Sequence, residues 1–280
     1  MKLLRYGPKG SEKPGLLDAE GQIRDLSNVV EDITPELLAA GRLADLAAVN
    51  PQLLPIVPGA PRLGVPVKGI GKFLGIGLNY TDHAGDVSDK PRTESVIFTK
   101  AISCLNGPND DVMLPRAPQC PDWEAELAVV MGRRARYVEE RDALAHVAGY
   151  VVVNDITDRG FQNASGQWDK GKGCDTFGPV GPWLVTADEI ANPQNLDLWL
   201  EHNGKRMQSG NTRNMIFTVA ELIANVSRYI TLEPGDILTT GTPIGVGSSF
   251  RPPIYLKPGD VMRLGVEGLG TQEQHVVAFA

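Results

Sequence analysis

From Gly69 onward, the chain is divided into short apolar or alternating runs, each bounded by Gly, Pro, Asn or Asp. Runs of this length, separated by turn residues, are typical of β-strands. Helical patterns are fewer, and the clearest occupy residues 140–148 and 218–230. Because long helical segments do not alternate with the strands, the pattern predicts an α+β, mostly β fold with a closed or folded-over β architecture. The predicted strands are 73–79, 95–101, 111–115, 124–132, 148–155, 196–204, 236–241, 260–268 and 273–279.

The first 65 residues have a different pattern. A helix is predicted over residues 33–49, with Thr34 as its N-cap and Pro35 in its first turn. The next segment, residues 50–66, contains five prolines and predicts an extended linker. We therefore predict a small N-terminal α+β domain over 1–65 and a larger domain over 69–280. Strands in the small domain are predicted at 1–6, 14–18 and 22–26.

The net charge of −7 disfavours a nucleic-acid partner. No apolar run approaches the length of a membrane span, and the first residues lack the apolar core of a signal peptide. We therefore expect a cytoplasmic protein with no membrane partner. The three cysteines, Cys104, Cys120 and Cys174, form no C-x-x-C pair, which argues against a disulfide framework or a structural zinc site.

Two acids enter an apolar strand in the segment PDWEAELAVV, residues 121–130. Side chains two apart on a strand point to the same face, so Glu124 and Glu126 project together. Such a pair is commonly the exposed polar face of a strand. If the strand is buried, however, the two carboxylates must become protonated or find a cation.

A second apolar strand ends in a third acid, Asp155, within the segment GYVVVNDITDRGFQ. A helical turn beyond it would place Arg159 and Gln162 on one face with Asp155. Three carboxylates, Glu124, Glu126 and Asp155, suit an octahedral Mg²⁺ or Mn²⁺. The sequence therefore predicts a divalent metal site.

Two further segments contain candidate functional residues. In NYTDHAGD, a helical turn would bring Asp86 to His83, where a carboxylate can orient and stabilise an imidazole; alone, such a pair is more often a surface contact. The glycine-rich segment GQWDKGKGCDTFGP contains Lys170 and Lys172, which form either a solvated loop or an anion-binding site. The glycine-rich segment GIGKFLGIG lacks a following helix and an acid at the expected distance, so we interpret it as a turn between strands.

Several motifs in order resemble the fumarylacetoacetate hydrolase superfamily: DWEAEL, VVNDITDRGFQ, QWDKGKGCDTFGPVGPWLVT, HNGKRMQ, MIF and LEPGDILTTGTPIGVG. The resemblance runs from about Gly69 to the C-terminus, and it is greatest to the bacterial 2,4-diketo-3-deoxy-L-rhamnonate hydrolases. It implies a mixed β-roll catalytic domain, a Mg²⁺ or Mn²⁺ cofactor, and a homodimer or higher homo-oligomer.

Matched residue by residue, the resemblance makes Glu124, Glu126 and Asp155 the metal ligands. It makes His83 the base that activates water, Asp86 its partner and Lys172 an active-site lysine. The usual partner of the base is a glutamate, so Asp86 departs from the family pattern. The residues expected to bind substrate are Lys100, Arg159, Gln162 and Thr242.

The reaction that the resemblance implies is hydrolysis of the C3–C4 bond of a 2,4-diketo acid, with the rhamnonate derivative giving pyruvate and lactate. Acylpyruvate hydrolysis and oxaloacetate decarboxylation pass through the same pyruvate enolate, so the metal site does not separate them. Two alternatives from other classes are a sugar-acid dehydratase or ureidoglycolate lyase, and a catalytically silent metal-binding protein. His83 and Lys172 argue against the last, because a structural ion needs neither.

Overall fold

The structure is a computed structural model that describes residues 1–39, 42–82 and 93–280. Its largest element, within these residues, is a ten-stranded sheet with the order β3-β2-β1-β12-β10-β9-β15-β4-β5, in which β6 pairs beside β12. The pairs β15–β4 and β12–β6 are parallel and the others antiparallel. The strands are β1 (Lys2–Tyr6), β2 (Lys13–Leu17), β3 (Ile23–Asp25), β4 (Phe73–Gly77), β5 (Val96–Lys100), β6 (Leu105–Asn106), β9 (Ala125–Met131), β10 (Val147–Asn154), β12 (Gly178–Thr186) and β15 (Ile237–Thr239).

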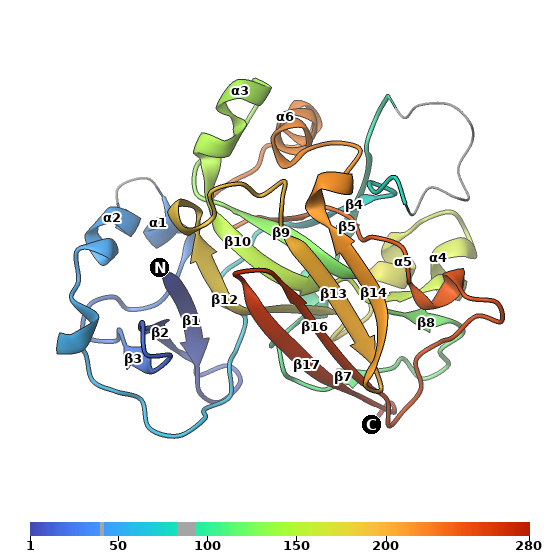
Figure 1. The fold of residues 1–280 in the computed structure, drawn as a ribbon, viewed down its shortest axis with the longest axis horizontal. Helices are drawn as coiled ribbons and strands as arrows, with labels where there is room; N and C mark the ends of the chain where they lie inside the picture. The colour runs from blue at the N-terminus through green and yellow to red at the C-terminus, as the bar shows by residue number, and fades with distance from the viewer. Residues whose placement is uncertain (40–41, 83–92) are drawn as a thin grey trace.

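A five-stranded sheet with the order β14-β13-β16-β17-β7 lies across one face of the large sheet (Figure 1). In the described residues neither sheet closes into a barrel, so the folded-over arrangement is the one observed. The strands of this sheet are β7 (Val112–Met113), β13 (Asp197–His202), β14 (Lys205–Asn211), β16 (Val261–Val266) and β17 (Gly270–Val277). A two-stranded sheet consists of β8 (Pro121–Asp122) and β11 (Thr157–Asp158).

The large sheet has a hydrophobic core on each face, as the alternation along β9 shows. Leu127 and Val129 belong to the core shared with the five-stranded sheet, whereas Ala128 and Val130 belong to the core shared with the N-terminal elements. Because side chains alternate along a strand, Glu126 continues the face of Ala128 and Val130. The acids therefore lie at one end of a face that is otherwise apolar.

The helices are short except for one, α6, which packs on the core beside the five-stranded sheet. Its apolar face is made by Val219, Leu222, Ile223 and Val226, at the spacing of an amphipathic helix. A reciprocal capping box between Thr218 and Glu221 defines where it begins. The α-helices are α1 (Pro35–Leu38), α2 (Arg42–Ala47), α3 (Glu140–Ala143), α4 (Arg159–Asn163), α5 (Asp169–Lys172) and α6 (Val219–Tyr229).

The α+β, mostly β class is confirmed, and each of the nine runs predicted between residues 73 and 279 contains a strand. Strand β12 was not predicted, because its two Gly-Pro pairs are typical of turns. The helix predicted over 33–49 is wrong as one element, since α1 ends at Leu38 and α2 begins at Arg42, with residues 40–41 outside the described chain. Thr34 caps α1 as expected: the amide of Leu37 donates to its hydroxyl at 3.5 Å.

The N-terminal segment extends the large sheet: Lys2 and Leu3 of β1 pair with Val185 and Leu184 of β12. Strands β1, β2 and β3 form an antiparallel meander and correspond to the three strands predicted in this segment. That residues 1–65 form a separate small domain stays a prediction. Among the described residues, no helix combines the length and the apolar character needed to cross a membrane.

Candidate metal centre and active site

The pairing of β9 with β10 brings two distant acids together. Ala125 lies opposite Asn154 in this antiparallel pair. One residue farther along, the amide of Asp155 donates to the carbonyl oxygen of Glu124 at 2.9 Å. The register of two buried strands therefore places Asp155 beside Glu124, and the alternation of β9 adds Glu126 on the same face.

Glu124, Glu126 and Asp155 form a compact cluster that we call the acid triad. One carboxylate oxygen from each lies within 4.8 Å of the other two. All three residues are buried, with exposed fractions of 5%, 1% and 0%. Carboxylates in such a position repel one another and lose hydration, so they need cations nearby.

Two lysines supply part of this positive charge from inside the protein. The ammonium group of Lys172 bridges the triad, donating to Glu124 Oε2 at 2.5 Å and to Asp155 Oδ2. Lys100 Nζ lies 2.7 Å from Asp155 Oδ1, the other oxygen of that carboxylate. Its hydrogen bonds go instead to the carbonyl oxygens of Lys172 and Ile156, so the contact with Asp155 Oδ1 is an ion pair without a directed hydrogen bond.

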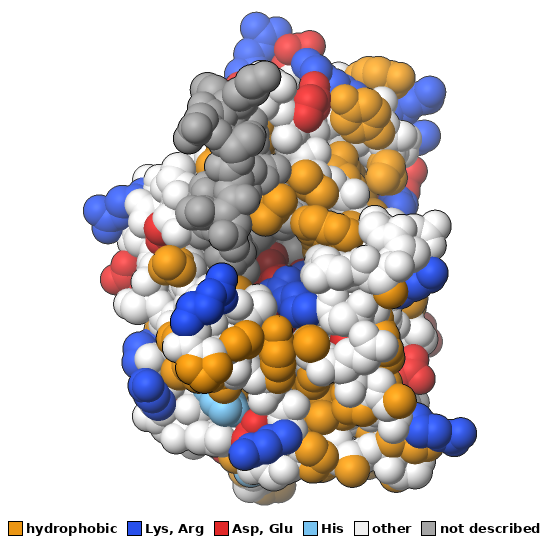
Figure 2. All heavy atoms as spheres, turned by 90° about the vertical axis from the view of Figure 1, so that its right-hand side faces the viewer, with side chains coloured by type: hydrophobic (Ala, Val, Ile, Leu, Met, Phe, Trp, Pro, Cys, Tyr) orange, Lys and Arg blue, Asp and Glu red, His pale blue; other side chains and the backbone are white. Residues whose placement is uncertain are grey.

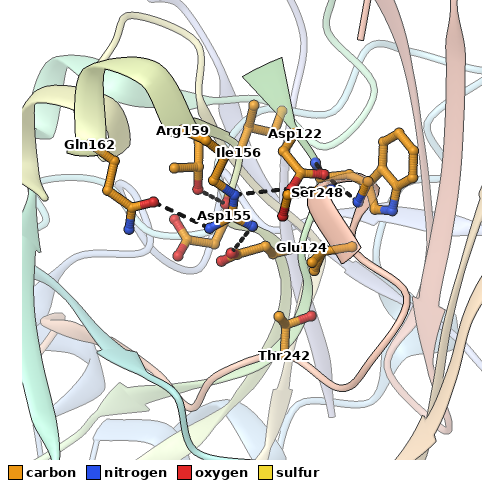
Figure 3. A network of polar contacts seen from close by, with 12 residues as sticks. Asp122, Glu124, Asp155, Ile156, Arg159, Gln162, Thr242 and Ser248 are labelled. Carbon is orange, nitrogen blue, oxygen red and sulfur yellow. Dashed lines mark hydrogen bonds and ion pairs between the residues drawn. The ribbon is translucent and has the colours of Figure 1, made fainter. Parts of the chain in front are cut away.

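The third cation is Arg159, which links the triad to a fourth acid (Figure 3). Its Nη2 donates to Glu124 Oε1 at 2.5 Å and its Nε to Asp122 Oδ2 at 3.0 Å. Asp122 also accepts hydrogen bonds from the amides of Gly247 and Ser248, at 2.6 and 3.1 Å. With the amide of Trp123, which donates at 2.9 Å, three backbone amides fix this carboxylate, and it holds Arg159 against the triad.

The prediction omitted Asp122, although a sequence signal for it exists. In DWEAEL the acids occur at every second position, 122, 124 and 126. A strand-like D-x-E-x-E pattern places all three on one side of the chain. Asp122 lies outside the triad, and its partner Arg159 connects it to Glu124.

The electrostatics of the triad are uneven. Burial would raise the pKa of Glu124, but Arg159 and Lys172 outweigh burial and lower it to about 2. Burial and the negative charges of Asp155 and Glu124 raise the pKa of Glu126 well above its usual range. Burial would lower the pKa of Lys172, but Asp155 and Glu124 raise it, so this lysine is a cation at neutral pH. Glu126 is the acid whose charge the side chains do not balance.

The donor set of the triad fits a divalent ion of the Mg²⁺ or Mn²⁺ type. Its three carboxylates are hard oxygen donors that converge from two strands. In the whole network, four carboxylates (those of the triad and Asp122) face three cations (Lys100, Arg159 and Lys172). With all four carboxylates ionised, one negative charge is left over, and a divalent ion would change the net charge of the network to +1. The ammonium of Lys172, which bridges two of the three acids, already shows that a cation is stable there.

A small cavity of about 40 Å³ lies over the triad. Arg159 and Gln162, from α4, and Thr242, which follows β15, line it on separate sides (Figure 3). The amide of Gly241, next to Thr242, donates to Glu126 Oε2 at 2.9 Å and fixes that carboxylate. In the middle of the face shown in Figure 2, acidic and basic side chains lie side by side at the surface.

The predicted site residues in the described chain come together, with differences in detail. The triad consists of three predicted metal ligands, Glu124, Glu126 and Asp155. Three predicted site residues contact it: Lys100, Arg159 and Lys172. The hydroxyl of Thr242 donates to the carbonyl oxygen of Ala125 and accepts from Gln208, both at 2.8 Å. His83 and Asp86 lie outside the described residues.

The geometric reason given for Arg159 and Gln162 is wrong. The prediction placed them on one helical turn with Asp155, but β11 (Thr157–Asp158) intervenes and α4 begins at Arg159. Asp158 caps α4, accepting from the amide of Phe161 at 3.1 Å. Arg159 reaches the triad because β11 pairs with β8, which precedes Glu124.

Comparison with known proteins shows the family of the chain. Residues 72–277 match the model of the fumarylacetoacetate (FAA) hydrolase C-terminal family. The chain belongs to this family. It is 58% identical over 278 residues to a 2,4-didehydro-3-deoxy-L-rhamnonate hydrolase of Sphingomonas sp. strain SKA58, covering 99% of this chain and 96% of that protein. The protein is therefore an enzyme of this family, and the Sphingomonas relative is named a hydrolase.

Solved structures of the fumarylacetoacetate hydrolase family share the whole fold. A fumarylacetoacetate hydrolase of Exiguobacterium antarcticum superposes with a TM-score of 0.90 at 35% identity, over all of both chains. A maleylpyruvate hydrolase of Sphingobium sp. SYK-6, determined with manganese(II) and pyruvate, superposes with a TM-score of 0.84 at 30% identity, again over all of both chains. The mixed β-roll expected from the sequence is therefore the fold of this family.

We expect Mg²⁺ or Mn²⁺ to raise the melting temperature of the purified protein, because binding to the native state alone stabilises it. At about 100 times Kd the gain is about 2.7 kcal/mol, which corresponds to roughly 5–10 °C for a chain of this size. Glu126→Gln should abolish this shift without lowering the melting temperature of the metal-free protein, because the ionised form of Glu126 is costly there. Glu233→Gln, at a partly exposed acid that pairs with Arg134, is the control and should keep the shift. A full shift in Glu126→Gln would contradict the assignment.

Asp122→Asn should lower kcat/KM by roughly 10- to 100-fold, because Arg159 loses the carboxylate that holds it against the triad. It should also destabilise the protein by about 1–3 kcal/mol, since buried amides lose a charged acceptor. Asp236→Asn is the matched control: Asp236 is equally buried and accepts from the amides of Lys72 and Glu233, but it precedes β15 at the end remote from the site. Urea unfolding and steady-state kinetics on both variants separate the two effects. Equal losses of kcat/KM in both would leave Asp122 a purely structural role.

Proposed function

We propose that the protein is a metal-dependent hydrolase that cleaves the C3–C4 bond of a 2,4-diketo acid. The proposed substrate is 2,4-diketo-3-deoxy-L-rhamnonate, and the products are pyruvate and lactate. One observation carries the proposal: a buried acid triad suited to a divalent ion is surrounded by three cations, of which Lys100 and Lys172 are buried and Arg159 is partly buried. Its support for the substrate is the high identity to the Sphingomonas hydrolase over nearly the whole chain.

Glu124, Glu126 and Asp155 would hold Mg²⁺ or Mn²⁺, which supplies a Lewis acid for the oxygens of the diketo acid. Around it, the chain offers groups suited to an anionic substrate. Arg159 and Lys172 are cationic at neutral pH, because neighbouring carboxylates raise the pKa of each. We assign them to the substrate carboxylate and to the negative charge that develops in the reaction.

Lys172 fits the role of an electrostatic stabiliser better than that of a general base. A base must lose its proton near neutral pH, whereas the pKa of Lys172 is raised. Its ammonium group lies at the triad, next to where the substrate oxygens would bind. We therefore propose that Lys172 stabilises the pyruvate enolate and that the proton of the attacking water goes elsewhere.

We assign that proton to His83, with Asp86 as its partner. His83 takes a proton from water, and the hydroxide adds to C4 of the substrate. The C3–C4 bond then breaks, and its electron pair stays on C3 as the enolate of pyruvate. C4 leaves as the carboxyl group of lactate, and the proton held by His83 is returned to C3. One water is consumed, its hydroxyl going to C4 and its hydrogen to C3.

We further propose that the enzyme is cytoplasmic and acts as a homodimer or higher homo-oligomer. This part of the proposal is supported by the family resemblance of the sequence. Light scattering coupled to size-exclusion chromatography tests the oligomer, and a mass of one 30.2 kDa chain would contradict it.

The substrate is tested by incubating the protein and Mg²⁺ with 2,4-diketo-3-deoxy-L-rhamnonate, acylpyruvates, oxaloacetate and ureidoglycolate. We expect pyruvate and lactate from the rhamnonate derivative, with the highest kcat/KM of the panel. Pyruvate from oxaloacetate alone would indicate a decarboxylase instead, and glyoxylate from ureidoglycolate a lyase. Full activity in excess chelator would contradict the metal dependence.

His83→Ala should lower kcat roughly 10²- to 10⁴-fold, the usual range for loss of a general base. The melting-temperature shift caused by Mg²⁺ should be unchanged, because His83 is not a ligand in this proposal. Loss of the metal shift together with activity would place His83 among the ligands. His275→Ala, at an exposed histidine, serves as the control.

A further inference from the structure

Two aromatic side chains, Phe98 and Trp168, stand between the cavity over the acid triad and a larger groove. Both line the cavity of about 40 Å³, and both line a neighbouring groove of about 510 Å³. Their ring centroids lie 5.6 Å apart with an interplanar angle of 49°. The ring of Phe98 also contacts the ammonium of Lys172, which lies 4.9 Å from the ring centroid. We call this pair the aromatic partition.

Two glycines of β4 make room for the aromatic partition. A Cβ atom at Gly77 would lie 2.3 Å from the ring of Trp168, and one at Gly75 would lie 2.2 Å from the ring of Phe98. Both distances are far shorter than any van der Waals contact, so neither position accepts a side chain while the rings stay in place. Glycine weakens the interior of a strand and often marks a close approach. These glycines belong both to the glycine-rich segment that we interpreted as a turn and to the predicted strand 73–79; in the structure they lie in β4, where they leave room for the rings.

The position of Trp168 is fixed relative to the triad. It immediately precedes α5, and Lys172 ends the same helix one turn later, where it contacts Glu124. Asp169 ties α5 to β5, because its carboxylate accepts hydrogen bonds from the amide and the hydroxyl of Thr99 at 3.0 and 2.9 Å. The indole is therefore held in place as part of the site rather than lying free on the surface.

The cavity has a polar and an apolar side. Glu124, Arg159 and Thr242 supply polar groups, whereas Phe98 and Trp168 supply apolar area. A diketo acid is divided in the same way: its carboxylate and 2-oxo oxygens are polar, and the substituent on C4 is the more apolar end. Burying an apolar group against aromatic rings is favourable, and leaving a carboxylate there is not.

We infer that Phe98 and Trp168 contact the C4 substituent of the substrate and determine which acyl groups the enzyme accepts. The inference rests on the proposed function, since it concerns the same site and the same class of substrate. A cavity of about 40 Å³ holds an ion with a little water but not a six-carbon acid. Because Phe98 and Trp168 separate this cavity from the larger groove, we expect the substituent to press against or displace the partition. A small substituent is accepted there, and a long one needs the groove beyond the rings.

The test is a series of acylpyruvates in which the reacting atoms are constant and the acyl chain grows from two to eight carbons. In the unchanged protein, kcat/KM should fall as the chain lengthens. Trp168→Ala should open the cavity to the groove and raise the ratio of kcat/KM for long over short chains by about tenfold or more. Phe98→Leu should change the ratio in the same direction and less strongly, because a side chain of moderate size remains.

Gly77→Ala provides an independent variant, because it removes no group from the site and displaces the indole instead. It should change the acyl-chain ratio from that of the unchanged protein, whereas Trp199→Ala, which removes an indole from β13, should not. An unchanged ratio in Trp168→Ala, with equal loss for every chain length, would overturn the inference and leave Trp168 a structural role. No turnover of any diketo acid by the unchanged protein would contradict the proposed function, and the inference would fall with it.

Discussion

The structure depends on the concentration of negative charge at the point where β9 begins and β10 ends. Two strands buried on both faces bring Glu124, Glu126 and Asp155 to within 4.8 Å of one another, and burial removes the water that would screen them. Isolated buried carboxylates would lose their charge. Lys100, Arg159 and Lys172 keep most of the network ionised, and Glu126, whose pKa is raised, marks the charge that still lacks a partner.

This arrangement needs a rigid scaffold, and the two hydrophobic cores provide one. A shift of one residue between β9 and β10 would turn Glu126 to the opposite face and separate Asp155 from Glu124. Each face of β9 is packed in its own core: one contains Leu127 and Val129, and the other contains Ala128 and Val130. A shift that exchanged the two faces would disrupt both cores. The N-terminal elements share a core with Ala128 and Val130 on the second face and thereby help to fix the register.

The parts of the site that follow from strand periodicity could be predicted from the sequence. Glu124 and Glu126 share a face because they are two apart, and Asp155 ends an apolar run that becomes β10. The contact of Lys100 with Asp155 could not be predicted, because it depends on how β5 meets a loop far away in the chain. Likewise, the position of Arg159 was predicted from a helical geometry that the structure does not have. The role of Gly75 and Gly77 could not be predicted either, because it depends on the rings of Phe98 and Trp168 packing against them.

The central claim is that the acid triad binds a divalent metal ion. The most direct test is a crystal structure of the protein soaked in Mn²⁺, with the ion located by its anomalous scattering. We predict one strong peak coordinated by a carboxylate oxygen of each of Glu124, Glu126 and Asp155, at about 2.0–2.3 Å, with Lys172 moved away from its bridge between Glu124 and Asp155. A fully loaded crystal with no peak at the triad, or with the ion bound by other residues, would contradict the account.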